Sequence, residues 1–227
     1  MGSINNGDAA LLLPADVRIM SFTSPMNDYL KYACADAATQ HTVLRNIIAD
    51  DPVLMGFLRG MAELELPDPL LGSGAIYNSV WNVLTGRPRY TGIKDADLVY
   101  FDAADRSYEA EDKVIKRVQS YFADSPIPPE VRNQARVHLW FPQKFGLNYP
   151  QLKNSAEMLN YFSTKTHAVA ARLEAGEIAI FAPFGLNDLF SFRLTPNPAL
   201  SNKATHDSKA ARAKAIWPEL QVEPWPE

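Results

Sequence analysis

The sequence predicts an α+β fold in which a mixed β-sheet forms the core and helices pack around it. Apolar residues recur at helical spacing over much of 25–66, which indicates a helical region before the sheet. From residue 67 onward, short apolar strands are separated by helical segments, an order that favours a mixed sheet. Two apolar stretches flank a Glu-Ala-Gly-Glu turn at 174–177, as the strands of a hairpin flank their turn.

Length and composition indicate one domain. The chain has 227 residues, of which 47% are hydrophobic and 21% are charged, so it is long enough to bury a core. We expect a poorly ordered leader at 1–24 and a single domain at 25–227. That domain divides into the helical region at 25–66, a sheet core at 67–195, and a C-terminal helix and tail at 196–227.

Charge, cysteine content and hydropathy exclude several classes of protein. A net charge of −4 argues against broad nucleic-acid binding. Cys34 is the single cysteine, which excludes a disulfide within the chain, and its alanine neighbours predict a small buried side chain. No apolar run approaches the roughly 18 residues that span a bilayer, and Met1–Asn6 lacks the features of a signal peptide. We therefore expect a cytoplasmic protein with no membrane partner.

Capping residues and the alternation of side-chain types predict further helices and strands. Asp51 followed by Pro52 is typical of a helix start, and Ser107 followed by two glutamates indicates another. Alternation of side-chain type predicts a strand from Ala135 to Phe141, with His138 on one face. Other expected elements are a short strand at 70–71, a helix that ends near Gly86, hairpin strands at about 168–173 and 178–181, and a helix that carries Lys203, Lys209, Arg212 and Lys214.

The most informative stretch joins a Gly-Ser-Gly turn at 72–74 to a strand that starts at Asp95. Side chains at i and i+2 of a strand share a face, so Asp95 and Asp97 are predicted to project together. Two convergent carboxylates repel unless a cation lies between them, and Mg²⁺ is the usual one. A glycine-rich helix start offers backbone N–H groups and a positive dipole end to phosphate. These residues predict a site for a metal-bound nucleoside triphosphate.

The same residues resemble the DNA polymerase β-type nucleotidyltransferase fold. That superfamily is marked by a hydrophobic-Gly-Gly/Ser turn and then a strand of the form Asp-hydrophobic-Asp/Glu-hydrophobic. Leu71-Gly72-Ser73 and Asp95-Ala96-Asp97-Leu98 match this pattern. More narrowly, the chain is similar to a family of small bacterial nucleotidyltransferase-like proteins. This likeness covers roughly residues 40–220 and is carried by 72–81, 95–105, 133–140, 182–190, Asn197-Pro198 and Trp217-Pro218.

The resemblance implies roles for the residues of the site. Asp95 and Asp97 are expected to ligate Mg²⁺, or Mn²⁺ in its place, and the substrate is expected to be an NTP. Backbone groups of the turn would hold the β- and γ-phosphates, with nearby cations in support. The candidates for phosphate binding are Gly72, Ser73, Arg89 and Lys94.

A third carboxylate on a later strand is also implied, and Val137-His138-Leu139 is the matching unit of this chain. A histidine there favours a general base toward the acceptor hydroxyl, or a neutral ligand that weakens a second Mg²⁺ site. Otherwise the third acid comes from elsewhere in the chain. The candidates are Asp102, Asp105 and Asp188.

The leading functional hypothesis is a Mg²⁺-dependent nucleotidyltransferase that moves NMP from an NTP to an unknown acceptor. The acceptor is a small molecule, an RNA or a protein. A non-catalytic nucleotide- or metal-binding protein is the alternative if the third acid is missing. A toxin-like, RNA-modifying transferase is a further alternative, suggested by the four cations of the expected C-terminal helix.

Overall fold

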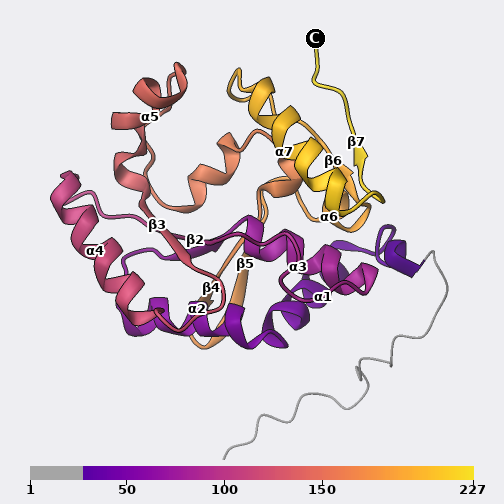
Figure 1. Cartoon of the computed structure of the whole chain (residues 1–227), viewed down its shortest axis with the longest axis horizontal. Helices are drawn as coiled ribbons and strands as arrows, with labels where there is room; N and C mark the ends of the chain where they lie inside the picture. The colour runs from indigo at the N-terminus through magenta and orange to yellow at the C-terminus, as the bar shows by residue number, and fades with distance from the viewer. Residues whose placement is uncertain (1–27) are drawn as a thin grey trace, which may run out of the picture.

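A computed structural model describes residues 28–227 of the chain (Figure 1). The expectations for the leader at 1–24 lie outside these residues. Helices surround a central sheet, and in this view α5 and α7 both rise above the strands. The α-helices are α1 Ala37–Ala49, α2 Pro52–Glu63, α3 Gly74–Thr85, α4 Tyr108–Tyr121, α5 Val137–Phe145, α6 Asn187–Phe190 and α7 Lys203–Ile216. The 3₁₀ helices are η1 Asp28–Leu30, η2 Gln134–Arg136, η3 Ala156–Tyr161 and η4 Lys165–His167.

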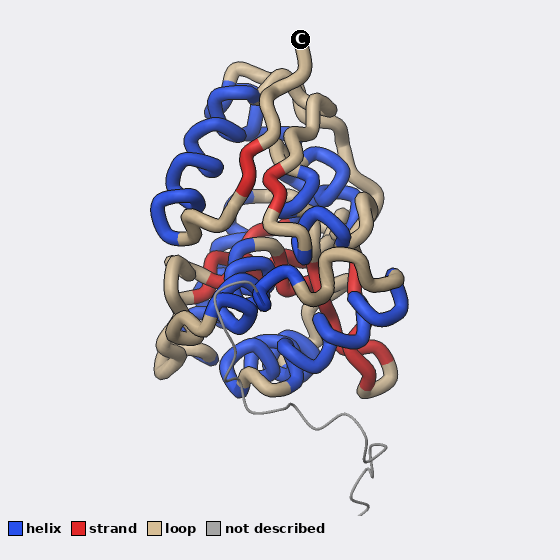
Figure 2. Tube along the Cα trace, turned by 90° about the vertical axis from the view of Figure 1, so that its right-hand side faces the viewer, coloured by secondary structure: helices blue, strands red, loops and turns tan. Residues whose placement is uncertain are grey.

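The central sheet has five strands in the order β3-β2-β1-β4-β5. β2 and β3 are parallel, and the other neighbouring pairs are antiparallel. These strands are β1 Leu70–Gly72, β2 Ala96–Tyr100, β3 Pro129–Asn133, β4 Ala170–Glu174 and β5 Glu177–Phe181. A parallel pair, β6 Arg193–Leu194 and β7 Gln221–Val222, lies apart from the main sheet (Figure 2). The mixed sheet among helices confirms the predicted α+β class.

Several local predictions are confirmed. Asp51 begins α2 by accepting hydrogen bonds from the N–H groups of Val53 and Leu54. Ser107 begins α4 by accepting one from the N–H of Ala110. The hairpin forms between β4 and β5, and both residues of its tip, Ala175 and Gly176, have positive φ.

The region before residue 50 differs in part from the expected helical pattern. There the structure forms η1, then a turn, and then α1. Asp36 begins α1 by accepting a hydrogen bond from the N–H of Thr39 at 2.7 Å, which ends any continuous helix from residue 28. Cys34 lies in the turn and is exposed, so the prediction that it is buried is wrong.

The predicted strand at Ala135–Phe141 is also wrong. The strand of this region is β3, which ends at Asn133, and α5 follows it. β3 is an edge strand that starts with proline and alternates Val131 with charged residues, so its apolar signal is weak. The longer apolar run that follows β3 in the sequence alternates in side-chain type, as a strand does. His138 therefore lies on a helix.

The two faces of the sheet pack against different cores. Leu71, Leu98 and Val131 belong to the main core, which also contains the buried rings of Trp81 and Trp217. A smaller core covers the opposite face and contains Leu70, Val99, Leu152, Met158, Leu159, Ala168 and Ala170. Since side chains alternate along a strand, odd-numbered positions of β2 face the smaller core. Within residues 28–227, no helix has the length and apolar character that a membrane crossing requires.

Candidate functional site

A sharp elbow, residues Gly72–Gly74, connects β1 to α3. Ser73 is buried and has φ of 50° and ψ of −109°, a conformation that a side chain rarely adopts. Its N–H donates to the carbonyl oxygen of Val169 at 2.8 Å, while its side chain makes no capping hydrogen bond. The amides of Gly74 and Ala75 open the helix and so have no intrahelical partner. The elbow therefore presents backbone donors, as the sequence predicts.

Three carboxylates converge beside this elbow. Asp97 lies on β2 opposite Gly72 of β1 on one side and Glu130 of β3 on the other. Asp95 precedes it by two residues, so the spacing brings the two aspartates to one face, as expected. Ligand atoms of Asp95, Asp97 and Glu130 all lie within 4.8 Å of one another. We call these three residues the carboxylate cluster.

The electrostatics of the cluster favour a cation. Burial, and then the charges of Asp95 and Glu130, raise the pKa of Asp97 to about 6. Lys209 and Arg132 act in the opposite direction and lower the pKa of Asp97. Three acids so close together are costly when all are ionised, and a divalent cation would remove that cost.

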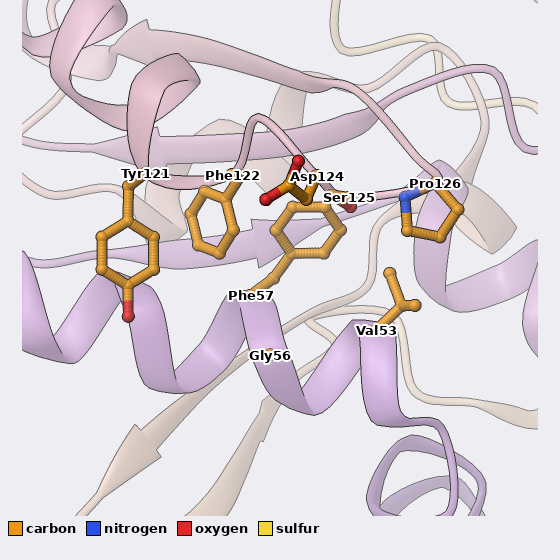
Figure 3. Close-up of a pocket in the computed structure, with 8 residues that line it drawn as sticks. All are labelled: Val53, Gly56, Phe57, Tyr121, Phe122, Asp124, Ser125 and Pro126. Atoms are coloured by element: carbon orange, nitrogen blue, oxygen red, sulfur yellow. The ribbon is translucent and has the colours of Figure 1, made fainter.

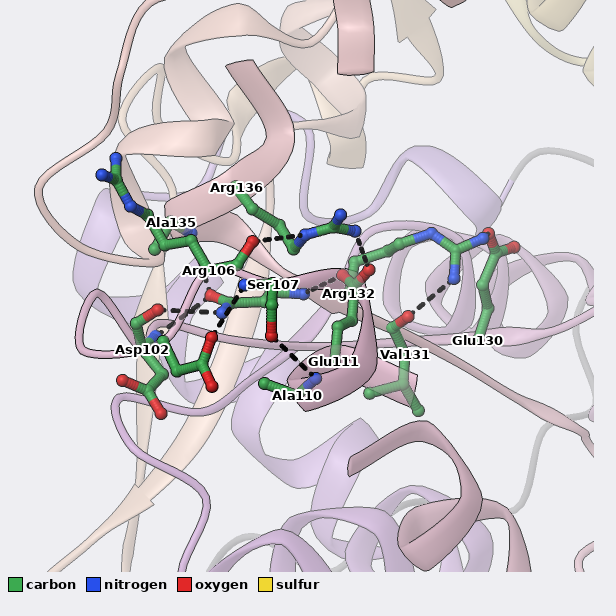
Figure 4. Close-up of polar contacts among 12 residues, drawn as sticks. Asp102, Arg106, Ser107, Ala110, Glu111, Glu130, Val131, Arg132, Ala135 and Arg136 are labelled. Atoms are coloured by element: carbon green, nitrogen blue, oxygen red, sulfur yellow. Dashed lines mark hydrogen bonds and ion pairs between the residues drawn. The ribbon is translucent and has the colours of Figure 1, made fainter. Parts of the chain in front are cut away.

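Glu130 is the outermost member of the cluster. Its side chain is 43% exposed and accepts a hydrogen bond from Nη2 of Arg132 at 2.8 Å (Figure 4). Nη1 of Arg132 donates to the carbonyl oxygen of Val131 at 2.7 Å, which fixes the guanidinium along β3. Glu130 was missed by the sequence analysis because it reaches the cluster through the pairing of β3 with β2, and no local pattern encodes that pairing.

The far end of β3 is held by a buried ion pair. Glu111 of α4 accepts a hydrogen bond from the N–H of Asn133 at 2.8 Å and also pairs with Arg136 (Figure 4). Asn133 in turn accepts the N–H of Asp102 and donates to its carbonyl oxygen. These contacts fix β3 beside β2, and so fix the position of Glu130 relative to Asp97.

The other predicted acids and His138 are not members of the cluster. Asp102 and Asp105 each accept a backbone N–H two residues ahead, at 2.9 Å, and so hold turns. Asp188 lies in the first turn of α6. His138 follows the end of β3 that is remote from Glu130, and its Nδ1 is buried without a hydrogen-bond partner. Partial burial and Arg106 lower the pKa of His138.

The two predicted phosphate-binding cations differ in their surroundings. Arg89 donates to the carbonyl oxygen of Asp50 at 2.7 Å and lies 3.8 Å from Oδ2 of Asp51, so it is tied to the start of α2. Lys94 is exposed and precedes Asp95 directly. Of these two cations, Lys94 is the one that the chain places next to the cluster.

The rings of Tyr77 and His167 pack together near the elbow, and the sequence analysis did not include them in the site. Tyr77 of α3 is buried, and its hydroxyl would lie 3.9 Å from a Cβ at Gly74. Burial, Asp97 and Asp95 all raise the pKa of Tyr77, so its hydroxyl stays protonated near the acids. The ring of His167 stacks on it at 4.2 Å between centroids, with both ring nitrogens buried and unpartnered. Burial lowers the pKa of His167 well below its usual value, which keeps the ring neutral.

A separate apolar pocket lies between α2 and the end of α4 (Figure 3). Its volume is about 200 Å³, and its lining consists of Val53, Gly56, Phe57, Tyr121, Phe122, Asp124, Ser125 and Pro126. None of these residues belongs to the elbow or to the carboxylate cluster. The pocket is therefore not part of the candidate site.

Known proteins include a family that this chain matches. A family described as nucleotidyltransferase matches residues 59–222, a range that contains the elbow and the whole cluster. The chain belongs to this nucleotidyltransferase family. This confirms the nucleotidyltransferase-like fold expected from the sequence. No curated protein matches the chain.

One solved structure is similar to this nucleotidyltransferase family member. Its title reads "The NMR structure of the protein reveals a CCA-adding enzyme head domain". The TM-score is 0.66 at 21% sequence identity, and the match covers 81% of this chain and 96% of the other. At this identity the likeness concerns the fold.

Proposed function

We propose that the protein is a Mg²⁺-dependent nucleotidyltransferase that moves NMP from an NTP to an acceptor. The observation that carries the proposal is the carboxylate cluster beside the elbow, in a chain of a nucleotidyltransferase family. Nucleotidyl transfer needs positioning and charge neutralisation more than covalent help from the protein. The elbow offers donors for positioning, and the three acids offer ligands for a neutralising cation.

The donor set fits a hard divalent cation. Asp95, Asp97 and Glu130 offer carboxylate oxygens alone, which suit Mg²⁺ or Mn²⁺ better than softer metals. Such an ion would neutralise charge on the phosphates and on the leaving pyrophosphate. The presence of a third acid supports catalysis over the alternative of a non-catalytic nucleotide- or metal-binding protein.

The elbow supports a role in holding phosphate. Gly72 has no side chain, so phosphate oxygens meet no Cβ beside Asp97. The free amides of Gly74 and Ala75 and the hydroxyl of Ser73 are donors at a positive helix end. We propose that they bind the β- and γ-phosphates, with Lys94 as the nearest cation along the chain. We further propose the cytoplasm, where NTPs are available, as the compartment.

Label transfer tests this proposal directly. The protein is incubated with α-labelled ATP, GTP, CTP or UTP, Mg²⁺ and separate pools of cellular RNA, protein and metabolites. We expect label in one pool together with release of pyrophosphate, and neither in Asp97→Asn. Asp102→Asn is the matched control, because the side chain of Asp102 holds only a turn. Failure of every NTP to bind or react would refute the proposal.

A further inference from the structure

We propose that Lys209 and Arg212 of α7 form an anion subsite that holds the β- and γ-phosphates of the NTP and the pyrophosphate that leaves. This inference rests on the proposed function and deepens it, since it assigns a subsite on an element far along the chain from the elbow.

The four cations of α7 divide into two pairs. Lys203 forms an ion pair with Asp207, four residues ahead on the same helix. Lys214 donates to the carbonyl oxygens of Pro218 and Leu220 and so closes the C-terminal end of the helix. Lys203 and Lys214 therefore have structural partners.

Lys209 and Arg212 have no such partners. Neither forms an ion pair or a hydrogen bond with another group among residues 28–227; the recorded contact of Lys209 is with the ring of Phe162, 5.9 Å from its Nζ to the centroid. Lys209 is half-buried, whereas Arg212 is exposed. A half-buried ammonium that forms no ion pair is costly, and a bound anion would offset that cost.

α7 is fixed in place at both ends. At its C-terminal end, the indole N–H of Trp217 donates to Oδ1 of the buried Asn82 of α3 at 3.1 Å. The ring of Trp217 also covers Gly92, in the loop that leads to Asp95, so closely that a Cβ there would overlap it. Near its N-terminal end, Nδ1 of the buried His206 lies 2.8 Å from Oγ1 of Thr164. Both ends of α7 are therefore fixed, the C-terminal one against the last turn of α3, and α7 lies above α3 in the view of Figure 1.

The charges of Lys209 and Arg212 act on groups of the carboxylate cluster and on Tyr77 near the elbow. Nζ of Lys209 lies 5.9 Å from the ring centroid of Phe162, which packs against the smaller core on the face of β2 that carries Asp97. Burial lowers the pKa of Lys209, while Asp97 and Asp95 act to raise it. Arg212 lowers the pKa of Tyr77, whose hydroxyl lies beside Gly74 of the elbow. Arg212 follows Lys209 by three residues on α7, so the two cations lie on the same side of the helix.

A polyphosphate placed between cluster and elbow needs cations of this kind. A divalent ion neutralises part of its charge, and the remaining oxygens of the β- and γ-phosphates require further donors. Arg and Lys donate to phosphate in different ways, Arg by a planar fork and Lys as a point charge. Lys209 and Arg212 offer both types beside the backbone donors of the elbow.

Calorimetric titration of inorganic pyrophosphate and of Mg²⁺·NTP tests the inference. Lys209→Met keeps the aliphatic stem and removes the charge, and Arg212→Gln removes the guanidinium. We expect each single variant to weaken the binding of both ligands about 10- to 100-fold, the usual range for one charge-assisted contact. Lys203→Met is the matched control on the same helix, with affinity expected within about twofold of wild type.

Two further measurements keep the outcome decisive. Lys209→Arg preserves the charge and is expected to restore most of the affinity, which a purely structural role of the lysine would not require. Unchanged affinity for pyrophosphate and NTP in the double variant Lys209→Met/Arg212→Gln would overturn the inference. If the wild type binds pyrophosphate through these cations but no NTP, the proposed function fails and the anion subsite stands.

Discussion

Asp97 and Glu130 face each other across neighbouring strands, yet the molecule holds them by different means. Asp97 lies on a central strand with hydrogen-bonded neighbours on both sides, and its backbone position leaves it little freedom. Glu130 lies on an edge strand, with its side chain 43% exposed and fixed by Arg132. The position of Asp97 therefore depends on the sheet, whereas that of Glu130 depends on side-chain contacts that a single substitution removes.

The largest effect on activity is expected when the two aspartates, Asp95 and Asp97, are substituted. Asp95→Asn combined with Asp97→Asn removes two ligand charges and leaves the shape of β2 intact. We expect metal-dependent transfer to fall by more than about 1000-fold, because charge neutralisation carries most of this type of catalysis. The rate of pyrophosphate release measures it. Near-normal turnover in a folded double variant would show that the reaction does not use these acids.

The second prediction concerns Glu111, whose contacts with Asn133 and Arg136 fix the edge strand β3. Glu111→Ala removes the acceptor of the Asn133 N–H and leaves Arg136 without its partner. We expect the free energy of unfolding to fall by about 3–5 kcal/mol, the usual cost of breaking a buried pair. Denaturant titration measures this change.

Glu109→Ala is the control for Glu111→Ala, because Glu109 occupies an exposed position in the first turn of the same helix. Its expected cost is at most about 1 kcal/mol, from the helix dipole alone. Equal losses in Glu111→Ala and Glu109→Ala would contradict the account of how β3 is held.

The third prediction decides between Glu130 and His138 as the partner of the two aspartates. Glu130→Gln keeps the size of the side chain but removes its charge, and we expect Mn²⁺ affinity to fall about 10- to 100-fold. His138→Gln is expected to stay within about twofold of wild type, because His138 lies beyond the other end of β3. The reverse result would restore His138 to the site.

The smallest effect is a pH dependence of stability in the metal-free protein. The pKa of Asp97 is about 6 in the folded state and about 3.9 in an unfolded chain. The folded state therefore binds the proton more tightly, and this group makes stability fall as the pH rises from about 4 to about 6. Asp97→Asn removes that fall, so the variant is expected to be more stable by about 1–3 kcal/mol at pH 7.5.

Unfolding in EDTA at pH 4.5 and 7.5 measures this difference. The gain of Asp97→Asn should be large at pH 7.5 and small at pH 4.5. With saturating Mn²⁺ at pH 7.5 the order should reverse, because the ion stabilises only the protein that binds it. If Asp97→Asn is less stable than wild type at pH 7.5 without metal, burial and the charges of Asp95 and Glu130 do not destabilise the Asp97 carboxylate.

The difference between the two acids also explains what the sequence could predict. The elbow and the aspartates form short local patterns, a Gly-Ser turn after apolar residues and an i, i+2 pair at the start of a strand, so both were found. Glu130 was missed because it reaches the cluster through the pairing of β3 with β2, which no local pattern encodes. The same holds for Lys209, which approaches from α7, and for His167, which stacks behind the elbow.

The incorrect strand at 135–141 has a related cause. Its apolar residues outnumber those of β3, and alternation alone cannot tell a surface helix from a half-buried strand. Cys34 was misplaced for a similar reason, since alanine-rich spacing fits a helix or a turn equally well. In each case the deciding contact lies elsewhere: Glu111 for the end of β3, and the cap at Asp36 for the start of α1.

Mn²⁺ titration followed by electron paramagnetic resonance tests the central claim most directly. If three acids from two neighbouring strands act as one ligand set, wild type binds Mn²⁺ at this site, and Asp97→Asn and Glu130→Gln each weaken that binding at least about 10-fold while Asp102→Asn keeps it. Equal Mn²⁺ binding by the wild type and all three variants would show that the cluster holds no metal.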